Sequence, residues 1–166
     1  MRRTFAILGS IAFFFVAPFT VAGLIPWWIT RGAMQPPLFA NDLTRVPGLV
    51  LAAVGVVILV DSFARFAIQG LGAPAPVAPP QHLIVSGLYR HVRNPMYVGV
   101  LAAIFGQALF FADLRLIVYG ALIWLAFHAF VRLYEEPTLQ RMFESEYEAF
   151  RANVPRWIPR IFPWWP

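Results

Sequence analysis

Four long apolar runs constrain what this chain can fold into. They cover residues 5–29, 46–66, 96–112 and 114–131. Each is close to the roughly 20 residues that a helix needs to cross the hydrocarbon core of a bilayer. Hydrophobic residues make up 60% of the chain and charged residues only 13%, unlike the composition of a soluble domain. The sequence therefore predicts a single-domain, all-α integral membrane protein with about four transmembrane helices.

The chain contains no lysine, so arginine supplies all of the positive charge behind its net charge of +5. Basic proteins often bind nucleic acid, but here the arginines flank apolar runs, which is typical of a protein oriented in a bilayer. Four spans would place on one side of the membrane Arg2, Arg3, Arg65, Arg90, Arg93, Arg132, Arg141, Arg151, Arg156 and Arg160, and on the other side Arg31, Arg45 and Arg115. The positive-inside rule puts the first side and both termini in the cytoplasm. We expect a bacterial inner-membrane protein with no nucleic-acid partner.

The sequence offers little for a metal site. Cysteine is absent, which excludes disulfides, thiolate metal ligands and cysteine nucleophiles. The histidines are His82, His91 and His128, and their spacing matches no metal-binding motif. We therefore expect no metal cofactor, and we interpret His91 and His128 as packing or interfacial residues.

The chain divides into four consecutive segments. Residues 1–66 hold two N-terminal transmembrane helices; a cleaved signal peptide is the alternative for the first, although the run is longer than a usual signal core. Residues 67–95 form a proline-rich cytoplasmic linker and a motif loop, and residues 96–131 form a tight transmembrane hairpin. Residues 132–166 are cytoplasmic. In them an amphipathic helix breaks before Pro155, and a tryptophan-rich tail lies at the membrane interface.

Prolines and one charged pair mark the N-terminal helices. Pro18 and Pro26 would kink or end the first helix, which is tolerated when neighbouring helices satisfy the freed backbone groups. Asp61 and Arg65 are four residues apart, so they share a helix face and can pair. We favour an interfacial ion pair over a functional site for these two residues.

Polar, aromatic and turn-forming residues crowd together in residues 86–99, directly before the third apolar run. Pro95 biases Asn94 away from helical conformation and fits the first turn of a helix, so the sequence predicts a shaped loop that feeds a helix. The hairpin brings the ends of the third and fourth helices together, which places Arg132, Glu135 and Glu136 beside this loop. Such a cluster suits a ligand that is charged and amphiphilic.

These residues carry a resemblance. The runs Ser86-Gly87-Leu88-Tyr89 and Arg93-Asn94-Pro95-Met96-Tyr97-Val98-Gly99, together with Glu135-Glu136, resemble the isoprenylcysteine carboxyl methyltransferase family and the related bacterial phospholipid methyltransferase-like proteins. The resemblance covers about residues 81–160 and includes Glu146-Tyr147 and Val154-Pro155-Arg156 in the C-terminal segment. It implies a membrane-embedded methyltransferase that uses S-adenosylmethionine without a Rossmann domain. The acceptor would be a lipophilic small molecule or lipid that enters from the bilayer.

The resemblance also implies roles for individual residues. Carried over by position, the cofactor-binding residues would be Gln81, His82, Leu83, Ile84, Tyr89, Arg93, Asn94, Pro95, Tyr97 and Glu135, the last binding the cofactor's amino group. Arg132 would orient the acceptor. Glu136 would serve as the base for an amine acceptor, which must lose a proton, whereas a carboxylate acceptor needs no base. The sequence leaves both kinds of acceptor open.

One position departs from the family pattern. The carboxyl methyltransferases usually have histidine where this chain has Asn94, and asparagine cannot act as a base near neutral pH. This puts a prenylcysteine substrate in doubt more than it does cofactor use. Two alternatives remain: a membrane reductase of unsaturated lipids, and a non-catalytic membrane subunit. The reductase would need a nicotinamide cofactor, for which the sequence offers no clear basic pocket. A degenerate subunit should have lost part of the motif.

Overall fold

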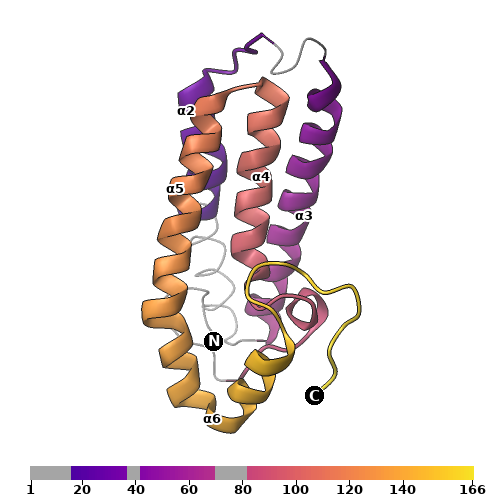
Figure 1. The fold of residues 1–166 in the computed structure, drawn as a ribbon, viewed down its shortest axis with the longest axis vertical. Coiled ribbons are helices and arrows are strands. Elements are labelled where there is room, and N and C mark those ends of the chain that lie inside the picture. The colour runs from indigo at the N-terminus through magenta and orange to yellow at the C-terminus, as the bar shows by residue number, and fades with distance from the viewer. Residues whose placement is uncertain (1–15, 37–41, 70–81) are drawn as a thin grey trace.

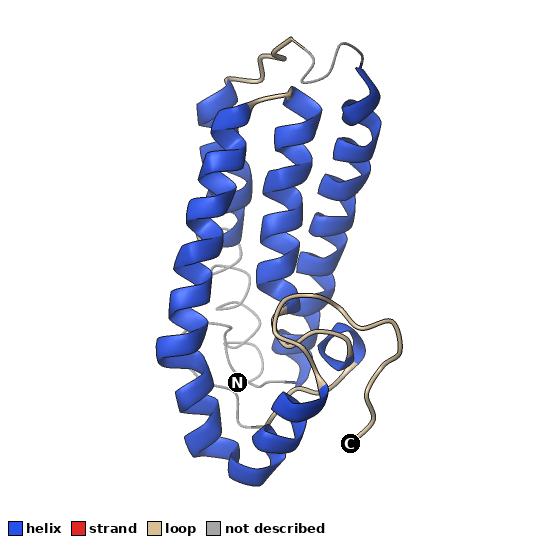
Figure 2. Ribbon diagram, viewed as in Figure 1, coloured by secondary structure: helices blue, strands red, loops and turns tan. Residues whose placement is uncertain are grey.

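The computed structural model describes residues 16–36, 42–69 and 82–166, and the regular elements in these residues are all helical (Figure 1, Figure 2). In chain order they are the π-turn η1 (Thr20–Leu24), α2 (Ile25–Thr30), the 3-10 helix η2 (Asp42–Thr44), α3 (Arg45–Gln69), the 3-10 helix η3 (Gly87–Arg90), α4 (Pro95–Phe111), α5 (Leu114–Phe130), the π-turn η4 (Val131–Glu135) and α6 (Glu136–Asn153). The all-α prediction is confirmed for the described part of the chain.

Two of the described helices are long and apolar enough to cross a membrane. One spans Arg45–Arg65. The other is the 40-residue segment Leu114–Asn153, in which α5, η4 and α6 follow one another without a loop but with a kink at Glu144. Only the part of the second helix up to Val131 has the composition of a span, because charged residues follow it. The other two predicted spans correspond to the shorter apolar helices Thr20–Thr30 and Pro95–Phe111. Much of the first predicted run lies outside the described residues.

Helices α3 and α4 run antiparallel and approach each other at glycines (Figure 1). A Cβ atom on Gly55 would lie 2.5 Å from the backbone nitrogen of Ala103, closer than real side chains come. A Cβ atom on Gly99 would lie 2.9 Å from the backbone oxygen of Gly55. Gly48 and Gly106 make a second close approach further along the pair. Small residues thus allow the two backbones to come into contact, as is typical of helices that pack closely in membranes.

The N-terminal helix is distorted directly before Pro26. Because proline has no N–H, it cannot donate to the carbonyl group one turn earlier. The chain widens into η1, in which the N–H of Ile25 bonds to the carbonyl oxygen of Thr20, five residues back. Two carbonyl groups of this turn are therefore left without their usual helical donors.

Neighbouring helices supply the missing donors. Gln107 Nε2 on α4 donates to the carbonyl oxygen of Ala22 at 2.7 Å. The Tyr119 hydroxyl on α5 donates to the carbonyl oxygen of Val21 at 2.8 Å. The prediction that adjacent helices satisfy the backbone groups freed by Pro26 is confirmed.

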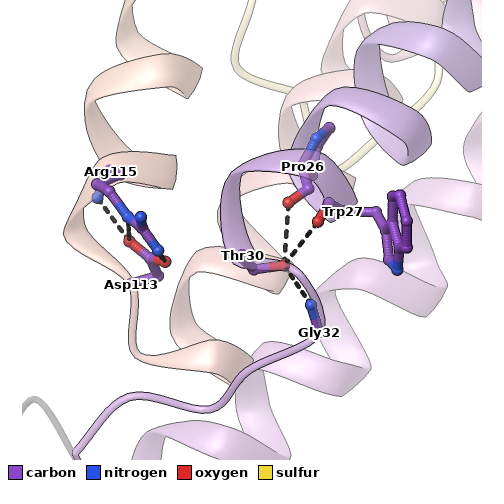
Figure 3. Close-up of polar contacts among 6 residues, drawn as sticks. All are labelled: Pro26, Trp27, Thr30, Gly32, Asp113 and Arg115. Atoms are coloured by element: carbon purple, nitrogen blue, oxygen red, sulfur yellow. Dashed lines mark hydrogen bonds and ion pairs between the residues drawn. The ribbon is translucent and has the colours of Figure 1, made fainter.

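Polar residues end the helices on the side of the molecule that carries the α4–α5 turn (Figure 3). The Thr30 hydroxyl donates to the carbonyl oxygen of Pro26 at 3.0 Å and accepts from the N–H of Gly32 at 3.2 Å. Asp113 caps α5, because its Oδ1 accepts from the N–H of Arg115 at 2.9 Å and its Oδ2 pairs with that residue's guanidinium at 2.6 Å. The predicted tight hairpin of α4 and α5 is confirmed.

At the opposite end, α6 first continues the direction of α5 and then turns back toward the motif loop (Figure 1). It ends at Asn153, before Pro155 as predicted. Its backbone departs from helical conformation at Glu144, with φ 39° and ψ −113°, a kink that the sequence periodicity did not predict. The core at this end contains Tyr147, Phe150 and Val154, with Leu83 and Val85 packed against them.

Candidate functional site

The motif loop packs against the end of α3. Gly87 begins η3 with a φ of +54°, and a Cβ atom on it would collide with the guanidinium of Arg65. Arg65 Nε donates to Asp61 Oδ2 at 2.8 Å, which confirms that these two residues pair. Arg65 therefore also packs against the loop, because its guanidinium fills the space that a side chain at residue 87 would occupy.

Tyr97 and Glu135 meet at the centre of the site. Pro95 starts α4, so Tyr97 lies in its first turn, and its hydroxyl donates to Glu135 Oε2 at 3.0 Å. The Tyr97 ring packs against Phe127, with 4.5 Å between ring centroids, and its centroid lies 6.5 Å from that of Trp157. A carboxylate beside several aromatic faces is a favourable place for a cationic group, since both attract positive charge.

The π-turn η4 presents Glu135 to this site. Pro137 has no N–H and cannot bond to the carbonyl oxygen of Leu133, so the helix widens and the N–H of Glu136 bonds back to Val131. Single π-turns inside α-helices are frequent at functional sites. Here the turn lies where two consecutive glutamates both find partners inside the protein.

Two arginines hold Glu136. Arg156 forms a bidentate pair with it, at 2.7 Å from Nε to Oε1 and 2.9 Å from Nη2 to Oε2, and Arg93 Nη1 lies 3.1 Å from Oε1. The side chains of Glu136 and Arg93 are only 11% and 9% exposed. Arg93 Nη1 also donates to the Tyr147 hydroxyl at 3.4 Å. Among the described residues, Arg93 Nε is buried without a hydrogen-bond partner.

The two glutamates have opposite electrostatic environments. Burial raises the pKa of Glu135 above its ordinary value, the Tyr97 hydroxyl offsets part of the increase, and the charge of Glu136 adds to it. Burial would also raise the pKa of Glu136, but the hydrogen bond from Arg156 and the charge of Arg93 outweigh it and lower that pKa. A carboxylate with a lowered pKa is a weaker base, and the proton-accepting role of Glu136 stays a prediction.

The remaining motif residues complete the cluster. Tyr89 is 7% exposed; burial raises the pKa of its hydroxyl, and the nearby charge of Glu135 raises it further. Asn94 is equally buried, and its Nδ2 donates to the carbonyl oxygen of Arg156 at 3.1 Å, so it fixes the backbone of the C-terminal tail. The structure thus brings together the predicted residues Tyr89, Arg93, Asn94, Pro95, Tyr97, Glu135 and Glu136.

Among the described residues, His82, Leu83, Ile84 and Arg132 are predicted site residues that stand outside this cluster. His82, Leu83 and Ile84 line a cavity of about 370 Å³ together with Glu146 and Trp164, and no residue of the cluster lines it. Arg132 is exposed on η4. Gln81 lies outside the described residues. The roles of these residues remain predictions.

A sequence model of the phospholipid methyltransferase family matches residues 43–146. The chain belongs to this family. The matched region runs from η2 into α6, and so includes the motif loop, Tyr97 and both glutamates. No curated protein and no solved structure gave a match to the chain. The resemblance drawn from the sequence is confirmed at the level of the family, and the family is one of methyltransferases.

In this phospholipid methyltransferase family member, sequence reasoning missed several residues that build the site. Arg156 and Tyr147 hold Glu136 and Arg93, and both stand in the tail pattern that carried the resemblance, so their place in that pattern was the available signal. Trp157 Nε1 donates to His128 Nδ1 at 3.2 Å, which agrees with a packing role for His128. Nothing in the sequence spacing links those two residues.

Proposed function

We propose that this protein is a membrane methyltransferase that uses S-adenosylmethionine to methylate a lipid-type acceptor at the cytoplasmic face of the membrane. Membership of the phospholipid methyltransferase family supports methyl transfer over the reductase and subunit alternatives. The observation that carries the proposal is the pairing of Tyr97 with Glu135 beside Phe127 and Trp157, in a family member with no Rossmann domain among its described residues.

The residues present fit the charged groups of S-adenosylmethionine. Glu135 would hold the ammonium group, because its carboxylate is oriented by Tyr97. Arg93 Nε, a buried donor without a partner among the described residues, would bond to the carboxylate group. The faces of Tyr97 and Trp157 would stabilise the sulfonium. Each charged group of the cofactor would therefore have a complementary group in this chain.

The proposed mechanism relies on positioning. When bound, the cofactor supplies an electrophilic methyl group on a good leaving group, so orientation and exclusion of water provide much of the rate. Tyr97 and Glu135 orient the methyl donor. The Glu136–Arg156 pair holds the C-terminal tail against the site and keeps water out. The acceptor, a lipid amine or a lipid carboxylate, approaches from the bilayer.

A four-span arrangement agrees with these roles. Helix α4 has 17 residues. Such a helix is about 26 Å long, slightly short of the hydrocarbon core, and the flanking loop residues extend it. The arginine-rich end that carries Tyr97, Glu135 and the tail would then face the cytoplasm under the positive-inside rule.

Isothermal titration of the detergent-solubilised protein with S-adenosylhomocysteine tests the cofactor. We expect micromolar binding by the wild type, loss of binding in Glu135→Gln, and about tenfold weaker binding in Tyr97→Phe, since one charge-assisted hydrogen bond is lost. Glu148→Gln, an exposed glutamate on α6, is the matched control and should bind like the wild type. Absence of binding by folded wild-type protein would overturn the proposal.

A transfer assay tests the acceptor. Protein in vesicles receives labelled S-adenosylmethionine with either phosphatidylethanolamine or a prenylcysteine as the lipophilic acceptor. Label transferred to the amine or to the carboxylate supports the proposal and names the acceptor class. If protein that binds the cofactor methylates neither, the lipid-type acceptor is wrong.

A further inference from the structure

The C-terminal tail, residues 155–166, is held in place by backbone hydrogen bonds although it is neither helix nor strand. The N–H of Arg93 donates to the carbonyl oxygen of Pro155 at 2.9 Å, that of Arg160 to His91 at 2.9 Å, and that of Trp164 to Arg90 at 3.0 Å. The loop and the tail thus run against each other at three points. A tail fixed in this way presents a defined surface.

That surface is apolar and exposed. The exposed fractions are 79% for Ile158, 86% for Ile161, 75% for Phe162 and 66% for Trp165. Leaving such side chains in water is unfavourable, in proportion to the apolar area exposed. A fixed segment with several large apolar side chains facing outward is typical of a surface that contacts a partner.

The surroundings of the tail indicate that this partner is the lipid bilayer. The tail loops at the end of the molecule where α4 begins, so it lies where a membrane interface would meet the helix ends (Figure 1). The guanidinium of Arg90 lies 3.8 Å from the ring centroid of Trp165, and Arg160 stands within the same segment. Apolar and aromatic side chains beside arginines are the pattern of segments that bind anionic lipid interfaces.

The same segment builds the candidate site. Arg156 holds Glu136, and Trp157 contacts both His128 and the ring of Tyr97. Ile158 follows directly and is exposed. We propose that the tail inserts Ile158, Ile161 and Phe162 into the cytoplasmic lipid interface, and that this insertion holds the tail against the motif loop. Contact with lipid and assembly of the site are then one event.

Site-directed fluorescence tests the insertion, and the absence of cysteine from the chain makes labelling specific. An environment-sensitive fluorophore is attached to the new cysteine of the Ile161→Cys or the Phe162→Cys variant. Each variant is placed in nanodiscs that contain phosphatidylglycerol and brominated lipids, which quench fluorophores inside the bilayer. Val57→Cys, on the exposed apolar face of α3, is the lipid-facing reference, and Glu148→Cys is the water-facing control. We expect the tail labels to be quenched like position 57. Quenching no greater than at position 148 would overturn the proposal.

Hydrogen exchange tests the coupling. We expect the amide of Arg93 to exchange about tenfold faster in the double variant Ile161→Ser, Phe162→Ser than in the wild type, because the tail opens more often. Val46→Ser is the control: Val46 is an exposed apolar residue in the first turn of α3, at the end of that helix away from the motif loop, and its substitution should leave this rate unchanged. An unchanged Arg93 amide in the double variant would show that insertion and site assembly are independent. Neither readout requires methyl transfer, so this inference can fail while the proposed function stands.

Discussion

Gly87 is the residue of the motif loop against which Arg65 of α3 packs. Its φ of +54° is strained for other residues, and its missing side chain leaves room for the Arg65 guanidinium. Gly32 also has a positive φ, of +70°, but a Cβ atom there would meet nothing within 4 Å. Comparing substitutions at these two glycines therefore distinguishes the cost of backbone strain from the cost of lost packing.

We expect Gly87→Ala to be more destabilising than Gly32→Ala. Both changes carry the roughly 1–2 kcal/mol cost of a left-handed conformation. Only the change at residue 87 also displaces Arg65. Thermal unfolding in detergent measures the difference, and titration with S-adenosylhomocysteine should show weaker binding for Gly87→Ala alone. Equal effects of the two changes would contradict the packing of Arg65 against the loop.

Glu136 and Glu135 should affect stability with opposite dependence on pH. The pKa of Glu136 is lowered on folding, so its contribution is present above the unfolded pKa and is lost as the pH falls through the folded pKa. The pKa of Glu135 is raised, so stability is lost as the pH rises through the raised pKa. Ionisation of Glu135 therefore costs stability, and the charge that it creates can bind a cation.

We expect Glu136→Gln to be less stable than the wild type at neutral pH, with the difference shrinking in acid. Glu135→Gln should gain stability relative to the wild type as the pH rises, because ionisation of Glu135 buries a charge, whereas glutamine stays neutral and can still accept from Tyr97. Unfolding midpoints between about pH 4 and pH 8 measure both trends. If the stability difference from the wild type changed in the same direction with pH for both variants, the opposite electrostatic environments would be contradicted.

At the scale of elements, two prolines produce the same distortion in different settings. Pro26 and Pro137 each follow a π-turn, η1 and η4, because each removes a backbone donor. The sequence predicted that Pro26 would disturb its helix, and the structure adds which side chains compensate. Those partners, Gln107 and Tyr119, stand far away in the chain, so no local pattern could identify them.

A double-mutant cycle on Pro26 and Tyr119 tests this compensation. Tyr119→Phe removes one hydrogen bond between helices, which is worth about 0.6 kcal/mol on average in a membrane protein. Pro26→Ala restores an N–H and allows the turn to return to α-helix, in which Ile25 can donate to Val21. We expect Tyr119→Phe to cost less in the Pro26→Ala background than in the wild type. Equal costs in both backgrounds, from unfolding in detergent, would contradict the assignment.

An element could be predicted from the sequence when the residues that define it are close together in the chain. Apolar runs and flanking breakers predicted α4, the α4–α5 hairpin and the end of α6, because helix boundaries depend on neighbouring residues. The kink at Glu144 was missed, since periodicity carries no sign of it. For the site, the motif indicated Tyr97 and Glu135. Arg156, the tail residue that binds Glu136, is brought there by the path of the chain after α6, and spacing in the sequence does not reveal that path.

At the scale of the whole molecule, the two ends of the helices differ in character. One end is closed by short polar contacts, such as Thr30 with Gly32 and Asp113 with Arg115 (Figure 3). The other end gathers the motif loop, both site glutamates and the tail. The end that carries the candidate site is also the arginine-rich end. Under the positive-inside rule, the charge asymmetry that would orient the protein therefore also supplies the groups around the candidate site.

This asymmetry gives a prediction about orientation. Ala33 is exposed at the polar end and Glu148 is exposed on α6 at the arginine-rich end. We expect an impermeant maleimide to label Ala33→Cys in intact cells and to label Glu148→Cys only after the inner membrane is opened. The unmodified chain has no cysteine and serves as the blank. The reverse pattern would place the site outside the cytoplasm, away from the cell's supply of S-adenosylmethionine, and would contradict the proposed function together with the orientation.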